Sequence, residues 1–170
     1  MENASHGQAR DGSLSRALEQ EHREIDGIIE KCADGSALDA DELAGLIRAV
    51  AELRRHIYAE EELLFPPLRR AGLMGPVLVM LREHGQMWPI LDRLEQGIAD
   101  GVEPDVLRTD CRQLFDLLQL HNPKEEQILY PEVDRVVGAD ASIDAHAFLD
   151  TGHVPTDWTC QFLRAEEARR

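Results

Sequence analysis

Apolar residues recur along most of the chain at intervals of three and four residues, which is the spacing of an amphipathic helix. Four segments follow this pattern, at about residues 13–33, 39–70, 75–99 and 104–137, and short Gly, Asp or Pro breaks separate them. The strict alternation of a half-buried strand does not occur along the sequence. The pattern therefore predicts an all-α protein, an up-down-up-down four-helix bundle with short connections.

Aspartates and prolines mark the two ends of the second expected helix. Either Asp39 or Asp41 could cap its beginning. Pro66-Pro67 lies shortly before its expected end at about Arg70. Because proline lacks the N–H of the helical hydrogen bond, we expect this pair to kink or terminate the helix.

The helical pattern divides the chain into three parts. Residues 1–12 are polar and are expected to be disordered, and residues 13–137 form the bundle. The remaining extension, 138–170, is less regular, with short helices expected at 142–149 and 157–167. We expect the extension to pack on a bundle end, or alternatively on a second copy of the chain in a homodimer. The apolar side of its last segment consists of Trp158, Phe162 and Leu163.

Composition and charge indicate which partners and which cellular compartment to expect for this protein. At 170 residues and 43% hydrophobic content, the chain suits one domain with a substantial core. A net charge of -15 disfavours binding to nucleic acid or to an anionic membrane surface. The sequence shows neither a signal-peptide apolar region nor a membrane span, so we expect a cytoplasmic protein. Three widely spaced cysteines indicate ordinary reduced thiols.

An internal repeat carries the chemistry. The pattern His-x-x-x-Glu-Glu-x-(Leu/Ile)-Leu-(Phe/Tyr)-Pro occurs at His56–Pro66 and again at His121–Pro131. The first and third helices match each other as well, through Glu21-His22 and Glu83-His84. The chain therefore resembles a duplicated helical hairpin, and each hairpin brings one lone histidine and one His-x-x-x-Glu pair. A site with pseudo-two-fold symmetry is expected.

The spacing within the repeat favours metal binding. Four residues turn a helix through about 400°, so the histidine and glutamate of each pair lie within about 40° of each other and one turn apart. Four inward histidines would be costly to bury without partners. Imidazole and carboxylate together suit iron, and six such ligands leave open coordination positions on two ions. The candidate ligands are His22, His56, Glu60, His84, His121 and Glu125.

These residues resemble the ligand pattern of the hemerythrin-like, or HHE cation-binding, family over about residues 14–137. The resemblance implies a four-helix bundle that holds two iron ions with an oxo or hydroxo bridge. It implies that Glu60 and Glu125 bridge the ions. The histidines would be terminal ligands, and we pair them by hairpin: His22 with His56, and His84 with His121.

The sequence departs from the oxygen-carrying hemerythrins on the third helix. Those proteins have a fifth histidine one turn from the equivalent of His84, where this chain has Met80 and Trp88. Reversible oxygen carriage is therefore disfavoured. Met80 and Trp88 are interpreted as core residues that could also wall the cavity and restrict it to small diatomic molecules or peroxide.

Other residues near the predicted ligands could complete the site. On an ideal helix their side chains point away from it, which favours solvated or capping roles. Pro123, between His121 and Glu125, and Pro89 each remove a helical hydrogen bond, and a local bulge could turn Glu126 inward. The additional candidates are Tyr58, Glu61, Glu83 and Glu126.

Three functions fit these observations. The first is a protein that binds or senses dioxygen, nitric oxide or iron. The second is a di-iron enzyme that disproportionates hydrogen peroxide or detoxifies nitric oxide, and it would draw electrons from a separate protein. The third is iron donation for iron-sulfur repair, because the resemblance extends to repair proteins; those have an additional cysteine-bearing N-terminal domain, where this sequence has a short polar start.

Overall fold

The structure is a computed structural model that describes residues 13–35 and 38–170. Within these residues all regular structure is helical, which confirms that the protein is all-α. The predicted disordered segment 1–12 lies outside the described residues. The helices are α1 (Leu14–Asp34), α2 (Ala40–Ala59), η1 (Glu60–Leu64), α3 (Phe65–Arg70), α4 (Met74–Asp100), α5 (Pro104–Lys124), η2 (Glu125–Leu129), α6 (Tyr130–Val136), α7 (Ala139–Thr151) and α8 (Gln161–Glu167).

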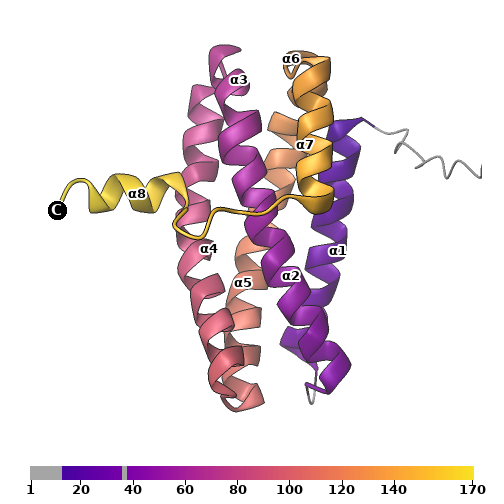
Figure 1. Cartoon of the computed structure of the whole chain (residues 1–170), viewed down its shortest axis with the longest axis vertical. Coiled ribbons are helices and arrows are strands. Elements are labelled where there is room, and N and C mark those ends of the chain that lie inside the picture. Colours follow the sequence, from indigo (N-terminus) through magenta and orange to yellow (C-terminus); the bar gives the residue numbers. More distant parts are fainter. Residues whose placement is uncertain (1–12, 36–37) are drawn as a thin grey trace, which may run out of the picture.

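Several of these helices join end to end into long rods. The run α2–η1–α3 is continuous, and so is α5–η2–α6. Together with α1 and α4 they stand side by side along the long axis of the molecule (Figure 1). Helix α1 contacts α2 and α5, and α4 contacts the same two helices. The rods therefore enclose a common interior.

Helix ends follow local capping chemistry. Ser13 accepts a hydrogen bond from the Arg16 amide at the start of α1. Asp39, rather than Asp41, caps α2, and it forms a reciprocal capping box with Glu42. Helix α4 ends at Gly101, whose φ of 63° is left-handed and suits glycine.

Of the two outcomes expected for the proline pair, termination does not occur at the prolines, because the second rod continues through them. Pro66 and Pro67 lie in the first turn of α3, which continues to Arg70. A π-helical turn, η1, comes immediately before them. The first turn of a helix is where a missing N–H costs least, so the prolines are accommodated there. Pro131 occupies the same place at the start of α6.

Two apolar clusters fill the interior, and a band of buried polar residues lies between them. Sequence neighbours show the division: Leu18 belongs to one cluster and Ile25 to the other, on either side of His22. On α4, Leu81 and Met87 are divided in the same way around His84. The polar band is therefore enclosed by apolar packing at both ends.

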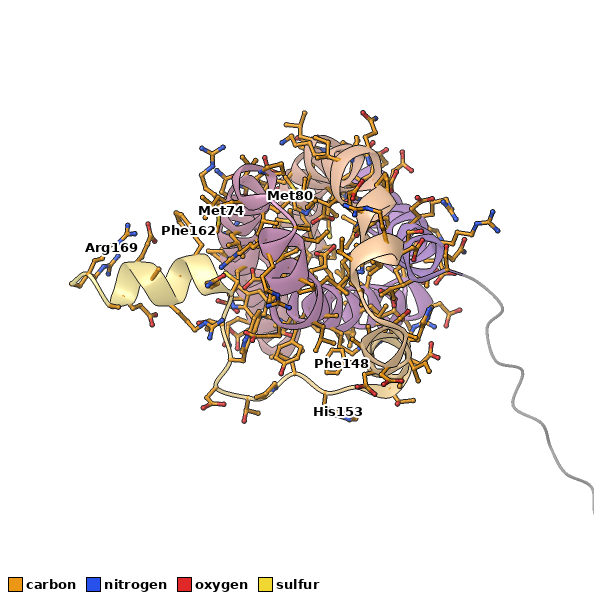
Figure 2. All side chains as sticks on the ribbon, turned by 90° about the horizontal axis from the view of Figure 1, so that it is seen from above. Met74, Met80, Phe148, His153, Phe162 and Arg169 are labelled. Atoms are coloured by element: carbon orange, nitrogen blue, oxygen red, sulfur yellow. The ribbon has the colours of Figure 1, made fainter. Side chains whose placement is uncertain are left out.

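The extension packs on its own chain. Helix α7 contacts α1 and α2, and α8 contacts α4. Trp158, in the segment between them, packs edge-on against Tyr58 and Trp88. Phe162 lies so close to Gly85 that a Cβ there would meet its ring at 2.5 Å, which explains the glycine. Beyond Phe162, α8 projects from the side of the molecule (Figure 2).

Across the part of the chain that the structure describes, no helix is both long and apolar enough to cross a membrane. The three cysteines Cys32, Cys111 and Cys160 are free and buried. All three belong to the same apolar cluster as Trp88.

Candidate metal centre

All six predicted ligands come together in the polar band. Each rod brings one histidine, and the two π turns bring the glutamates. Their ligand atoms form two groups that each lie within 4.8 Å, and both groups include Glu60 and Glu125. We call these groups the first half, which contains His22 and His56, and the second half, which contains His84 and His121. All six residues are buried.

Glu60 divides its two carboxylate oxygens between the halves. Its Oε1 lies 3.2 Å from His56 Nε2, and its Oε2 lies 3.3 Å from His84 Nε2. Glu125 does the same, with Oε2 at 3.3 Å from His22 Nε2 and Oε1 at 3.1 Å from His121 Nε2. This is the arrangement that a pair of bridging carboxylates requires.

Every histidine of the site has a carboxylate on its outer nitrogen. An Nδ1–H held by a carboxylate leaves Nε2 as the nitrogen that faces the interior, and such partners orient histidine ligands in metal sites. Two of these glutamates precede a site histidine in sequence, and two follow the central glutamates. The pairs are His22 with Glu126 (2.9 Å), and His56 with Glu21, His84 with Glu61 and His121 with Glu83 (2.8 Å each).

The expected roles of Glu61, Glu83 and Glu126 are thereby corrected. We expected solvated or capping side chains, but all three accept hydrogen bonds from site histidines. Helix geometry explains the difference. Glu61 and Glu126 lie in π turns, which change the direction of their side chains, and Glu83 reaches across to the neighbouring rod.

The π turns are the structural basis of the centre. In each, an amide bonds to the carbonyl five residues earlier: Phe65 to Glu60, and Tyr130 to Glu125. The extra residue per turn directs two consecutive glutamates towards site histidines. The expected bulge after Pro123 is present, and it does turn Glu126 inward. Proline is not its general cause, because Tyr58 stands at the position of Pro123 in the first repeat.

Tyr130 is a site residue that the sequence reasoning missed. Its hydroxyl oxygen lies 3.0 Å from Nε2 of both His22 and His56, and it donates to Glu60 Oε1 at 2.7 Å. Glu125 Oε2 is 3.2 Å away. The hydroxyl oxygen thus lies among the four candidate ligand atoms of the first half. The signal was the Phe/Tyr alternation in the repeat, because Phe65 stands at the equivalent position of the first repeat.

The centre carries strongly perturbed pKa values. Burial and Glu125 oppose ionisation of Glu60, but His56 and His84 outweigh them and lower the pKa of Glu60 to about 2. Burial alone would lower the pKa of His84, yet the Glu60 and Glu61 carboxylates raise it to about 10. The pKa values of the other three histidines are raised as well, despite burial, by their carboxylate neighbours. Without metal, protons therefore supply the positive charge of the centre.

The second half has the properties of a cation site. Glu60 Oε2, Glu125 Oε1 and His84 Nε2 are buried, and within the described structure they make no hydrogen bond. Polar atoms that make no hydrogen bond are costly to bury, and a cation among them would reduce that cost. The donor set of imidazole and carboxylate suits iron, zinc or manganese. The residues therefore fit the pair of metal ions that the sequence suggested.

Three of the proposed additional residues lie elsewhere. Tyr58 stacks on Phe148, with ring centroids 4.9 Å apart. Trp88 packs against Trp158 and under the Arg54 guanidinium. Met80 lines a largely apolar cavity of about 270 Å³ together with residues that include Pro76, Val79, Lys124 and Leu129. These contacts make the three residues part of the packing around the centre.

Comparisons with known proteins agree with this geometry. Curated relatives include the iron-sulfur cluster repair proteins YtfE of Yersinia pestis (strain Pestoides F) and Yersinia pseudotuberculosis serotype O:1b (strain IP 31758). Each is 29% identical over 102 residues, which covers 54% of this chain and 46% of the relative. The chain thus spans about half the length of these relatives. No solved structure matches it. The hemerythrin HHE cation binding domain model matches residues 13–133, so the chain belongs to the hemerythrin HHE cation-binding family.

Proposed function

We propose that this protein holds two iron ions in an up-down-up-down four-helix bundle and uses them to bind or sense dioxygen, nitric oxide or iron. One observation carries the proposal: Glu60 and Glu125 each present one oxygen to each half of the centre. Two cations placed between the halves would share both carboxylates. Their charge would replace the protons that the buried histidines otherwise hold.

Each residue of the centre would have a defined role in holding the two ions. His22 and His56 would hold one ion, His84 and His121 the other, and the two central glutamates both. Iron supplies redox chemistry and positions for a small ligand when it is bound. The surrounding apolar clusters keep bulk water away, which strengthens every electrostatic interaction at the centre.

Metal analysis followed by optical titration tests the proposal. Protein loaded with ferrous iron without oxygen should hold close to two ions per chain, and dioxygen or nitric oxide should change its spectrum in proportion to the protein. Zero or one ion per chain would refute the di-iron site. Repeated consumption of added peroxide would instead identify an enzyme.

Iron donation for iron-sulfur repair is a second candidate, favoured by the similarity to the Yersinia iron-sulfur cluster repair proteins. This function requires that iron leaves the centre, whereas sensing requires that it stays. Loaded protein incubated with an apo iron-sulfur protein, sulfide and a thiol reductant distinguishes them. Transfer faster than release to a chelator of similar affinity would support donation.

A further inference from the structure

Tyr130 places its hydroxyl where the first half of the centre would hold its ion. Four ligand atoms surround the oxygen at 2.7 to 3.2 Å, from His22, His56, Glu60 and Glu125. These four residues are also the ones that form the first metal-binding group. An ion entering this group must therefore displace the hydroxyl or take it as a ligand.

Packing leaves the tyrosine little room to withdraw. The residue is 1% exposed and belongs to an apolar cluster. Its ring lies against His22 with centroids 5.3 Å apart. Its backbone begins α6 directly after the π turn, and Pro131 follows it. If the Tyr130 hydroxyl moved about 2 Å away from an ion at the middle of the first half, it would lie at the length of a metal–oxygen bond and would be a ligand. If the whole side chain left the first half, it would leave a void in a packed core.

The second half has no such group. Phe65 occupies the equivalent position and stacks on His84, with ring centroids 5.7 Å apart and an angle of 10° between the planes. It has no oxygen to offer. The buried atoms without hydrogen bonds at the centre, Glu60 Oε2, Glu125 Oε1 and His84 Nε2, all face this half.

We propose that Tyr130 is a seventh protein ligand, bound through its oxygen to the ion of the first half alone. The inference rests on the proposed function, because it requires an ion in each half. On binding, the phenol releases its proton to solvent and its oxygen keeps the electron pair. The ion of the second half keeps one more open position, which is where a small molecule would bind.

This ligand changes the interpretation of the missing fifth histidine. Met80 and Trp88 supply no nitrogen ligand, and on that ground the sequence disfavoured reversible oxygen carriage. A tyrosine oxygen on one ion restores an asymmetric pair by a different route. The ligand count therefore no longer argues against reversible oxygen binding.

Visible absorption of the ferric protein tests the assignment, since a phenolate bound to ferric iron gives an intense charge-transfer band and resonance-enhanced tyrosine vibrations. The chain has two tyrosines, and the other, Tyr58, stacks on Phe148 outside the centre. Tyr58→Phe is thus a matched control. We expect wild type and Tyr58→Phe to show the band and Tyr130→Phe to lose it. Tyr130→Phe should also weaken binding of one of the two ions by about 10-fold or more, the loss typical even of an outer partner.

Phe65→Tyr extends the test to the second half. It should add a second phenolate contribution to the ferric spectrum. The Phe65→Tyr variant should also have a higher melting temperature without metal, because the new hydroxyl could form a hydrogen bond with the buried atoms of the second half that make none.

The proposal is overturned if wild-type protein binds two ferric ions without a phenolate band. It is equally overturned if wild type binds one ion and Tyr130→Phe binds two, since Tyr130 would then block the first half. Failure of wild type and Tyr130→Phe to bind any metal would instead refute the proposed function itself.

Discussion

The two halves of the centre come from the same repeat yet differ by one oxygen atom. In the first half, the Tyr130 hydroxyl bonds to His22, His56 and Glu60. In the second half, Phe65 leaves buried nitrogen and oxygen atoms without hydrogen bonds. The repeat thus gives both halves the same scaffold, and a single phenol makes the two halves unequal.

This difference predicts an order of loading. An ion in the second half meets buried atoms that make no hydrogen bond, whereas an ion in the first half must displace the hydrogen bonds of Tyr130. The second half should therefore bind its ion more tightly.

The largest effect is expected from Glu60→Ala, because this residue gives one oxygen to each half. Its loss removes a ligand and a balancing charge from both ions, so metal content should fall from about two ions to near zero. Glu62→Ala is the matched control: it changes an exposed glutamate of the same π turn and should keep both ions. Full occupancy in Glu60→Ala, measured by metal analysis, would show that this carboxylate is not shared.

Single histidine variants should separate the halves. His84→Ala removes a ligand of the second half alone and His22→Ala one of the first half alone, so each should retain about one ion. Because the second half fills first, His84→Ala should weaken the first step of a metal titration and His22→Ala the second. Calorimetric titration measures both steps. Equal effects of the two variants on both steps would contradict unequal halves.

Substitution of the glutamates that accept from the histidine Nδ1 atoms should have smaller effects on metal affinity, and these effects should again differ between the halves. The Glu61 side chain, which bonds to His84, is 1% exposed, whereas the Glu126 side chain, which bonds to His22, is 35% exposed. Glu61 Oε2 also accepts a hydrogen bond from the backbone N–H of Gln161, which connects the extension to the centre. Glu61→Gln should lower metal affinity by about 10- to 100-fold, and Glu126→Gln by less because water can substitute there. A larger loss in Glu126→Gln would contradict this order.

The smallest effect is a pH dependence of the metal-free protein. The pKa of His84 is raised from 6.5 to about 10, so the stability that its proton gives is complete below about pH 6.5 and is lost as pH rises towards 10. The pKa of Glu60 is lowered from 4.5 to about 2, so its contribution is lost only as pH falls from 4.5 towards 2. Thermal unfolding should show the metal-free protein melting lower at pH 9 than at pH 6. Bound metal should raise the melting temperature more at pH 9 than at pH 6, because the metal replaces histidine protons that are already partly lost at pH 9. A smaller increase at pH 9 than at pH 6 would show that metal does not replace these protons.

Helical periodicity predicted the all-α class, and the repeat of His-x-x-x-Glu indicated the six central residues. His22, His56, His84 and His121 lie on inward apolar stripes, so ordinary helix geometry brings them together. Pairing by hairpin also agrees with the two groups in the structure. The prolines do not terminate the second rod, because the π turn before them places them in the first turn of the next helix.

Tyr130 was not among the predicted site residues, and the geometry of the helix gives the physical reason. On an ideal helix, a residue five positions after Glu125 lies about 140° away from it. In a π turn, hydrogen bonds join residues five apart, and Tyr130 therefore returns to the face of Glu125. Helical periodicity does not reveal such a turn. Glu21 was missed because its partner, His56, is on a neighbouring rod.

If two ions lie between the halves and share Glu60 and Glu125, both should be visible by anomalous X-ray scattering at the iron edge in crystals of iron-loaded protein. We expect two peaks per chain: one near Nε2 of His22 and His56 with the Tyr130 oxygen beside it, and one near Nε2 of His84 and His121. A single peak, or two peaks of which either lies outside these groups, would refute the shared di-iron centre.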